Sequence, residues 1–516
     1  MMRIGGWSAA SAVGAVLLLA SVTANAQLVD NVLKWWKDPF NIEDKTAPAP
    51  GQRWDSGKSL KEVPPPKEYG ETVDFNEPLS LPQLTEFALL NNPRTRLAWL
   101  NARAAAAAVG IASADDFPVI TGGWSFSRAR PTSGTTGLLA NWLNRWGPQI
   151  SFSYSLYDFG LGEARQQAAE FRLLAANLAQ NRTLQEVVFQ VEQAYYQLIG
   201  IEALVRVNEQ AVRNLETALD AARRRRESGV ATVADVFRSE TQVAQARLTL
   251  TRSRGEFEKA RGQLAVVVGL PVNSVLRVLP LTAPPQTQDS MRAINDYLDT
   301  VKTSRADLAA AQAQVDAARA TATATAKASM PSIDISGNTQ HSQWHAQGAG
   351  NDARTNAQTS AASTATGITQ SVYRPSTQSY LFGLNVRIPI FDGFRNNYAQ
   401  RQAQAQVQIA EVQRDQLYRQ TQLEVWQSFY DLQTVNGSIN STEALVKSAE
   451  QTAQAVLARY QGGFGTILDL ITAQQDETSA RTQRIQSYLD WYTVLARLNF
   501  AVGAGDLMTT KTETKK

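Results

Sequence analysis

The feature that most constrains this chain is an eight-residue pattern that occurs twice, as Gly229 to Val236 and again, 234 positions later, as Gly463 to Leu470. In each copy a glycine follows a long helical pattern, and a threonine stands three residues before an aspartate. This order indicates a helix end followed at once by a helix start, so each copy is predicted to be the tip of a helical hairpin. The same spacing places Tyr157-Asp158 onto Phe391-Asp392. The chain is therefore predicted to be a duplicated unit.

Long helices lead to and from both tips. Between residues 161 and 228 apolar side chains recur every seven positions, starting with Val191, Leu198 and Val205, which is typical of a coiled coil. Residues 396–461 repeat this pattern before the second tip. Returning helices are predicted at 233–268 and after the second tip, and alanine-rich opening helices at 82–114 and 295–329. An opening and a returning helix together match one long helix in length, so we expect them to stack end to end, with a collar at the midpoint.

A period of two marks the strands. Ile150, Phe152, Tyr154 and Leu156 alternate with serines, and apolar residues alternate again from Tyr380 to Ile390. Shorter runs near residues 124–126 and 333–335 complete one β-hairpin per unit. The alternation and length are those of a membrane-spanning strand with one lipid-facing and one water-facing side. Residues 348–377, rich in Ser, Thr, Ala, Asn and Gln, are predicted to be a mobile loop.

Four strands are too few to close a membrane barrel, and lipid tolerates no open sheet edge. The barrel must then be shared between chains. Three chains would supply twelve strands and a ring of helical hairpins continuing the barrel as a tube, although the sequence favours closure without fixing the number at three.

Composition narrows the class of protein. The 516 residues carry 50 basic and 47 acidic side chains, a net charge of +3 that does not favour nucleic acid as a partner. The chain has no cysteine, which excludes disulfides, thiol catalysis, cysteine metal sites and lipid attachment through an N-terminal cysteine. Phosphate-binding glycine loops and nucleophile elbows are also missing, so we expect no enzyme and no cofactor.

The chain divides into five segments. Residues 1–26 have the basic, apolar and small-residue order of a cleavable secretory signal, the alternative being an uncleaved membrane anchor. Residues 27–76 form a proline-containing extension, either lying over a folded surface or partly disordered. Residues 77–284 and 285–505 are the two repeats, and residues 506–516 are a polar tail.

The duplicated helix–strand–strand–helix–helix order and the two tip patterns make residues 77–505 resemble the TolC family of outer-membrane factors. The resemblance implies a mainly α fold with a small β part: a homotrimer with a shared twelve-stranded barrel in the outer membrane of a Gram-negative bacterium and an α-helical tunnel in the periplasm. It also implies a periplasmic adaptor at the tips and an inner-membrane transporter. The implied function is an exit duct that passively conducts toxic small molecules. Type I protein secretion is the alternative within this class; a periplasmic or surface coiled-coil protein is the alternative outside it, which leaves the amphipathic strands without a role.

The resemblance also implies gate residues near the tips. In the family's pattern an aspartate after the first tip contacts a tyrosine before the second, which here are Asp235 and Tyr460. An inner aspartate matches Asp469, while the arginine expected two residues beyond the second tip glycine is Gly465 and a second inner aspartate is Thr472. The adaptor-contact residues are the tips themselves: Gly229, Val230, Ala231, Thr232, Gly463, Phe464, Gly465 and Thr466.

Simpler interpretations compete for several of these residues. Each tip Thr and Asp pair also has the spacing of a capping box, which is a sufficient reason for both residues and is compatible with a pore role. The run from Arg223 to Arg226 is either a solvated face or an adaptor-docking surface. The two histidines, His341 and His345, lie in a strand or loop region, and we expect no metal site there.

Overall fold

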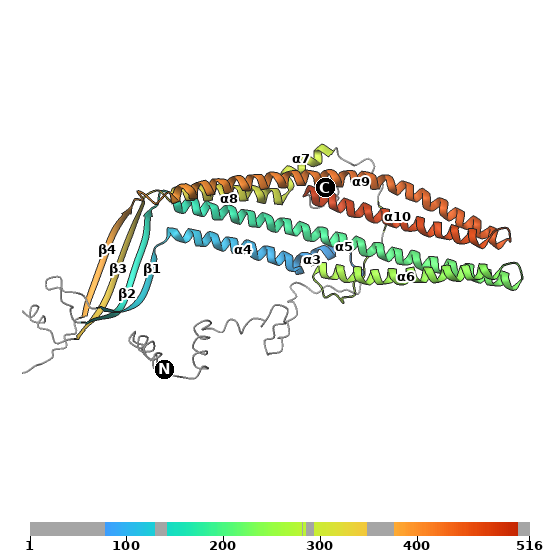
Figure 1. The fold of residues 1–516 in the computed structure, drawn as a ribbon, viewed down its shortest axis with the longest axis horizontal. Helices are drawn as coiled ribbons and strands as arrows, with labels where there is room; N and C mark the ends of the chain where they lie inside the picture. The colour runs from blue at the N-terminus through green and yellow to red at the C-terminus, as the bar shows by residue number, and fades with distance from the viewer. Residues whose placement is uncertain (1–77, 130–141, 281, 285–293, 348–375, 504–516) are drawn as a thin grey trace, which may run out of the picture. The chain divides into compact units, whose positions relative to one another are not determined.

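The structure is a computed structural model that describes residues 78–129, 142–280, 282–284, 294–347 and 376–503. All of them belong to one of the two units into which the chain divides, Tyr69–Lys516, and the described residues of this unit are mostly helical, with one antiparallel sheet (Figure 1). The predictions for the signal, the extension, the loop at 348–375 and the tail lie outside the described residues.

The elements repeat as the duplication predicts. The first repeat contains α3 (Leu81–Asn91), α4 (Pro93–Ser113), β1 (Val119–Ala129), β2 (Trp142–Tyr157), α5 (Leu161–Glu227) and α6 (Val233–Val268). The second contains α7 (Ile294–Ser304), α8 (Ala306–Lys327), β3 (Ser332–Gln347), β4 (Ser376–Arg387), α9 (Arg395–Gln461) and α10 (Ile467–Val502). Both long helices have 67 residues, which is about 100 Å at 1.5 Å per residue, and both returning helices have 36.

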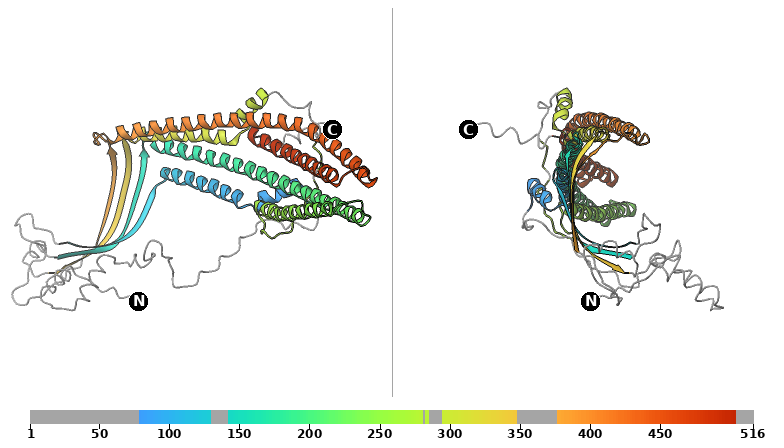
Figure 2. Two further views of the ribbon diagram at one scale, coloured as in Figure 1. Left: turned by 45° about the vertical axis from the view of Figure 1, so that its right-hand side comes forward. Right: turned by 90° about the vertical axis from the view of Figure 1, so that its left-hand side faces the viewer.

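The four strands form a single sheet in the order β1-β2-β3-β4, with every neighbouring pair antiparallel (Figure 2). The register aligns Ile120 with Phe152 and Ile335 with Leu384, so apolar side chains share one face. On the other face, Gln340 donates to Ser125 Oγ at 3.2 Å. The predicted amphipathic strands are confirmed, and β1 and β4 are the edges of the sheet. Strand β4 ends before Ile388 because Pro389 has no N–H for a ladder, and it already includes residues 376 and 377, which were expected in the loop.

The opening helices differ from the prediction, because each is broken in two. The first break falls at Asn92, whose backbone is extended (φ −67°, ψ 127°) and whose side chain caps α4 by accepting from Arg94 N at 2.8 Å. Pro93 explains the break, since a proline disfavours the helical conformation of the residue before it and suits the first position of a new helix. Asn92 Nδ2 also donates to the Val267 carbonyl at 2.7 Å, near the end of α6. The predicted end-to-end meeting of opening and returning helices is thus confirmed in the first repeat.

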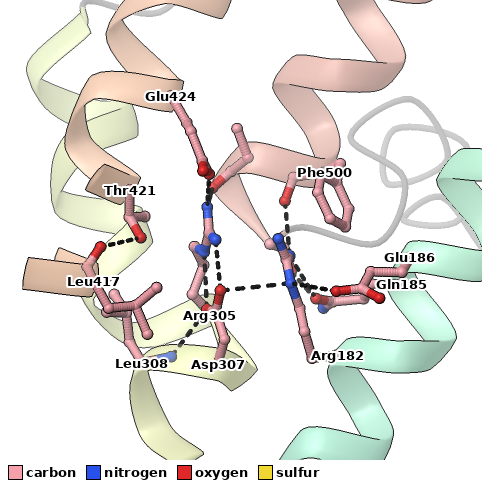
Figure 3. A network of polar contacts seen from close by, with 12 residues as sticks. Arg182, Gln185, Glu186, Arg305, Asp307, Leu308, Leu417, Thr421, Glu424 and Phe500 are labelled. Atoms are coloured by element: carbon pink, nitrogen blue, oxygen red, sulfur yellow. Dashed lines mark hydrogen bonds and ion pairs between the residues drawn. The ribbon is translucent and has the colours of Figure 1, made fainter. Parts of the chain in front are cut away.

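The second break falls at Arg305, between α7 and α8, where charged side chains meet (Figure 3). Arg305 Nη1 donates to Glu424 Oε2 and to the Ala501 carbonyl, both at 2.9 Å, and Arg305 Nη2 donates to Asp307 Oδ2 at 2.5 Å. The Arg305 side chain is 2% exposed. Burial alone would raise the pKa of Asp307, but the hydrogen bonds and charge of Arg305 outweigh it and the pKa lies below its ordinary value.

Arg182 of α5 joins the same network. Its Nε lies 3.5 Å from Asp307 Oδ2, its Nη1 donates to the Phe500 carbonyl at 3.2 Å, and its guanidinium carbon lies 3.7 Å from the centre of the Phe500 ring (Figure 3). The end of α10 is therefore tied to α5, α8 and α9 by charged groups.

The two joints occupy equivalent positions in the repeats. Arg305 corresponds to Asn92 at the offset of 213 that relates the opening helices, and Ala501 corresponds to Val267 at the offset of 234 that relates the returning ones. Each side chain bonds the same carbonyl of its returning helix. One geometry is therefore built twice, once with a neutral amide and once with a buried arginine.

The helices lie in a layer whose outer helices next to the strands, α4 and α9, are joined to the edge strands β1 and β4. Near the strands, helices pack in the order α4, α5, α8, α9; towards the tips the order is α6, α5, α10, α9. Apolar clusters lie along α5 and α9, with Leu198 and Leu264 in the first repeat and Val425 and Trp491 in the second. Among the described residues one helical stretch, Pro93–Asp116, is long and apolar enough to cross a membrane by those two criteria, and 6% of its most apolar window is buried.

Candidate functional site: the two helical tips

The first tip closes with a turn that requires glycine. Gly229 has φ +77°, and the amide of Val230 donates back to the Arg225 carbonyl at 2.8 Å. This left-handed turn satisfies carbonyls left open at the end of α5. Thr232 then caps α6: Asp235 N donates to its Oγ1 at 3.2 Å, and Thr232 N donates to Asp235 Oδ2 at 3.0 Å.

The second tip has the same construction. Gly463 has φ +88°, and Phe464 N donates to the Arg459 carbonyl at 2.9 Å. Thr466 and Asp469 exchange two hydrogen bonds of 3.2 Å. Both predicted capping boxes are therefore confirmed.

The hydrogen bonds of the capping boxes also set the charge of the two aspartates. Those from backbone and side chain of Thr232 lower the pKa of Asp235, and those of Thr466 lower the pKa of Asp469. Both carboxylates are therefore ionised at neutral pH and could attract cations if several chains brought them together around a pore. Capping alone is a sufficient reason for each aspartate in the single chain, so their role in a pore stays a prediction.

Tyr460 occupies a different environment from the two aspartates. It is 3% exposed and packs against Ala218 and Ala222 of the first hairpin and Leu470 of the second. Burial raises its pKa against the opposing charge of Arg225. Within the described residues its hydroxyl forms no hydrogen bond, with Asp235 or with any other group, although the charge of Asp235 adds to the raised pKa of Tyr460. The role of the Asp235 and Tyr460 pair in a gate stays a prediction.

The residue that reaches Tyr460 is Arg225, one of the four arginines of the predicted solvated face or adaptor-docking surface, Arg223 to Arg226. Arg225 Nη1 donates to the Tyr460 carbonyl at 2.7 Å, and its guanidinium carbon lies 4.6 Å from the centre of the Tyr460 ring. A usable signal was present: Arg225 continues the stripe of small residues Ala218 and Ala222 at helical spacing, so it shares their face of α5. Of its neighbours, Arg223 pairs with Glu240 at 2.8 Å.

The tip glycines and the exposed apolar residues remain predictions as adaptor contacts. Val230 and Phe464 are 65% and 84% exposed, so both apolar side chains are available to a partner. Among the described residues no three His, Asp or Glu side chains are grouped so as to hold a metal ion, and His341 and His345 both lie in β3.

Each repeat supplies two strands to one sheet with an apolar and a polar face, and a long helical hairpin that continues it. This arrangement defines the chain as a channel-forming protein of the outer membrane. The family model "Outer membrane efflux protein" matches residues 84–270 and 297–504, and the chain belongs to this family. The resemblance to TolC-like proteins is thereby confirmed, as are the transport class and the outer-membrane location. The family and the similar structures are channel proteins rather than enzymes.

Individual relatives cover most of the chain. It is 27% identical over 431 residues to Protein CyaE of Bordetella pertussis, covering 82% of each chain. It is 24% identical over 444 residues to the probable efflux pump outer membrane protein TtgC of Pseudomonas putida, covering 85% of each. The solved structure of the outer-membrane channel OprN shares the fold, with a TM-score of 0.69, 19% identity and coverage of 86% of this chain and 98% of that one.

Proposed function

We propose that three copies of this chain form the exit duct of a tripartite export system, conducting toxic small molecules from an inner-membrane pump and its periplasmic adaptor to the exterior. The observation that carries the proposal is the four-stranded sheet, apolar on one face and polar on the other, whose two edges pair with no other strand among the described residues. In lipid such edges must pair, and only a second copy offers a strand of matching length and alternation.

The helical layer supports the same closure. The sheet ends at β1 and β4, and the helical layer ends at α4 and α6 on one side and α9 on the other. One rotation can therefore close strands and helices together, and three copies give the twelve strands of a small membrane barrel.

Exposed side chains at both edges fit this arrangement. On α9, Leu423, Trp426 and Tyr430 form an apolar stripe that is 42–54% exposed, and on α4 Leu97 and Ile111 are 61% and 74% exposed. We interpret the apolar, alanine-rich α4 as a surface for close packing against the α9 of a neighbouring copy, rather than as a membrane span.

The polar face of the sheet suits a passive conduit. Hydroxyl and amide groups dominate it, as in the bond from Asn385 Nδ2 to Ser336 Oγ at 3.0 Å. Such a wall offers hydrogen bonds without a strong charge preference, so selectivity is assigned to the tips, with Asp235, Tyr460 and Asp469 as gate residues and the tip loops as adaptor contacts.

Fractionation and bilayer recording test the duct. The native protein is expected in the outer-membrane fraction as a heat-modifiable trimer that forms pores in planar bilayers, and a soluble periplasmic monomer would refute the proposal. Deleting its gene should lower the minimum inhibitory concentrations of toxic compounds. Loss of a protein from the culture medium, with unchanged drug tolerance, would instead identify a protein-secretion duct.

A further inference from the structure

A cavity of about 630 Å³ lies between α5, α9 and α10, beside the second joint. Sites for small molecules have volumes of about 300–1,000 Å³, so this one has the size of a ligand site. Aromatic rings from all three helices line it: Phe189 of α5, Trp426 and Tyr430 of α9, and Phe500 of α10. The ring centres of Phe189 and Phe500 are 4.9 Å apart, as are those of Trp426 and Tyr430. The wall therefore offers flat apolar surfaces to a ligand.

Three charged side chains also line this cavity, namely Glu424, Asp431 and Arg497. Asp431 and Arg497 form a loose ion pair of 3.8 Å, and both side chains are about half exposed. Glu424 Oε2 accepts from Arg305 at 2.9 Å, but the guanidinium of Arg305 is shared with Asp307 (Figure 3). The faces of aromatic rings carry partial negative charge as well. Aromatic faces beside two carboxylates suit a flat molecule with a positive charge.

The equivalent positions of the first repeat lack this chemistry. At the offset of 234, the three charged residues correspond to Gln190, Gln197 and Gln263, and Phe500 corresponds to Val266. The helical framework is the same in both repeats, so it does not by itself require charges or this ring. The aromatic and acidic lining is specific to the second repeat.

The cavity lies on the face of the helical layer that points away from α7. That helix packs on α9 through Tyr297, whose ring centre is 6.1 Å from that of Phe429 and which shares an apolar cluster with Val425. Gln427, which lines the cavity, is two residues from both Val425 and Phe429, so it points to the opposite side of α9. Inside a closed tube α7 would obstruct the bore, so the proposed duct has α7 outside and the cavity facing the bore.

We propose that this cavity is a binding site for amphipathic aromatic cations in the wall of the tunnel. The inference rests on the proposed duct and names a chemical class of molecule that the duct binds during passage. Phe189 and Phe500 supply stacking surface, and Asp431 supplies charge. Trp426 and Tyr430 also belong to the stripe on α9 that the proposed duct packs against a neighbouring copy, so the site lies beside a boundary between copies.

Binding of ethidium, a flat aromatic cation, to the full-length assembled protein in phosphatidylcholine nanodiscs tests the site by fluorescence anisotropy. Phe189→Leu removes a ring and Asp431→Asn removes a charge, and each should weaken binding by about 2- to 5-fold. Arg497→Gln leaves Asp431 unpaired and should tighten binding. The aromatic anion 8-anilinonaphthalene-1-sulfonate should respond to the two charge variants in the opposite direction.

The same helix supplies a charge-matched control. Asp415 lies on α9, pairs with Arg414 at 2.7 Å and is 58% exposed, compared with 52% for Asp431. Asp415→Asn removes the same charge away from the cavity and should bind ethidium as the wild type does. Unchanged ethidium affinity in both Phe189→Leu and Asp431→Asn would overturn the site.

Single-channel current in planar bilayers tests whether the cavity faces the bore. Ethidium should reduce the current of the wild type and of Asp415→Asn, and should reduce that of Asp431→Asn less. Equal block in Asp431→Asn and the wild type, despite weaker binding, would overturn the placement in the tunnel wall. A wild-type protein that forms neither trimer nor pore would overturn the duct instead, and the ethidium titrations on that protein would still decide the site.

Discussion

The buried arginine at the second joint should contribute more stability than the asparagine at the equivalent position of the first. Arg305→Met removes the guanidinium that Asp307, Glu424 and the Ala501 carbonyl share. Removing one partner of a fully buried ion pair costs about 3–5 kcal/mol. Glu424 is 37% exposed and Arg182 stays 3.5 Å from Asp307, so solvent and a second cation reduce the expected loss to about 2–3 kcal/mol.

Asn92→Ala provides the matched comparison. It removes the cap on α4 and one neutral hydrogen bond to Val267, which together are worth about 1–2 kcal/mol. Both joints pack against neighbouring turns of α5, but their hydrogen bonds share no partner, so each cost is assigned to its own joint.

Hydrogen exchange of the detergent-solubilised protein measures both costs. Amides in the last turn of α10 should exchange about 30- to 140-fold faster in Arg305→Met, and those in the last turn of α6 about 5- to 30-fold faster in Asn92→Ala. Each variant should leave the other joint unchanged, which serves as its internal control. An equal increase in exchange rate at the two joints, or no increase in Arg305→Met, would refute the conclusion that ion pairs stabilise the second joint.

The network of Arg305, Asp307 and Glu424 also determines how the stability of the second joint changes at low pH. The pKa of Asp307 is lower in the folded chain than its ordinary value of 3.8. Its stabilising effect is therefore fully present above that value and is lost as the pH falls below it. Exchange at the end of α10 should be insensitive to pH-driven opening between pH 5 and pH 7, after correction for the intrinsic rate, and should accelerate below about pH 4 in the wild type but not in Asp307→Asn.

Three further predictions concern the sheet and the tips. Leu384→Lys, on the apolar face of β4, should lower barrel stability by about 2–4 kcal/mol, whereas Asn385→Lys on the polar face should not. Heat-modifiability of the trimer on gels would show the difference. An equal loss of stability in both variants would contradict the assigned faces. Thr232→Ala should cost about 1 kcal/mol at the start of α6, seen as faster exchange of its first-turn amides, with Thr232→Ser as the conservative control. Tyr460→Phe removes a buried hydroxyl that has no hydrogen-bonding partner among the described residues. It should leave the tip as stable as the wild type, or more stable by up to about 1–3 kcal/mol, as measured by hydrogen exchange in the last turn of α9. A loss of that size would mean that the hydroxyl is hydrogen-bonded in the assembly.

Local and periodic features were predictable from the sequence, because they depend on residues close together in the chain. The tip motifs fix a glycine in a left-handed turn and a threonine cap within eight residues, and the alternation in Ile150 to Leu156 fixes both strand and faces. The duplication followed from the constant spacing, and with it the equal lengths of the paired helices.

Some details were locally encoded but missed. Pro93 marks the break at Asn92, but the prediction of a helix over residues 82–114 left it out of account. The break at Arg305 has no proline to mark it, and only its correspondence to Asn92 at the offset of 213 could have located it.

The contacts that join distant segments were decided by the tertiary structure alone. Arg182, Arg305 and Glu424 lie more than a hundred residues from one another in sequence, and their charges meet only because α5, α8, α9 and α10 pack around one point. In the same way, nothing local distinguishes Arg225 from the arginines beside it. Helical periodicity placed it on the alanine face, but the packing of the second hairpin against that face decided that its partner is Tyr460. A sequence specifies which groups each helix presents, whereas their pairing depends on which faces the fold brings within a few ångströms of each other.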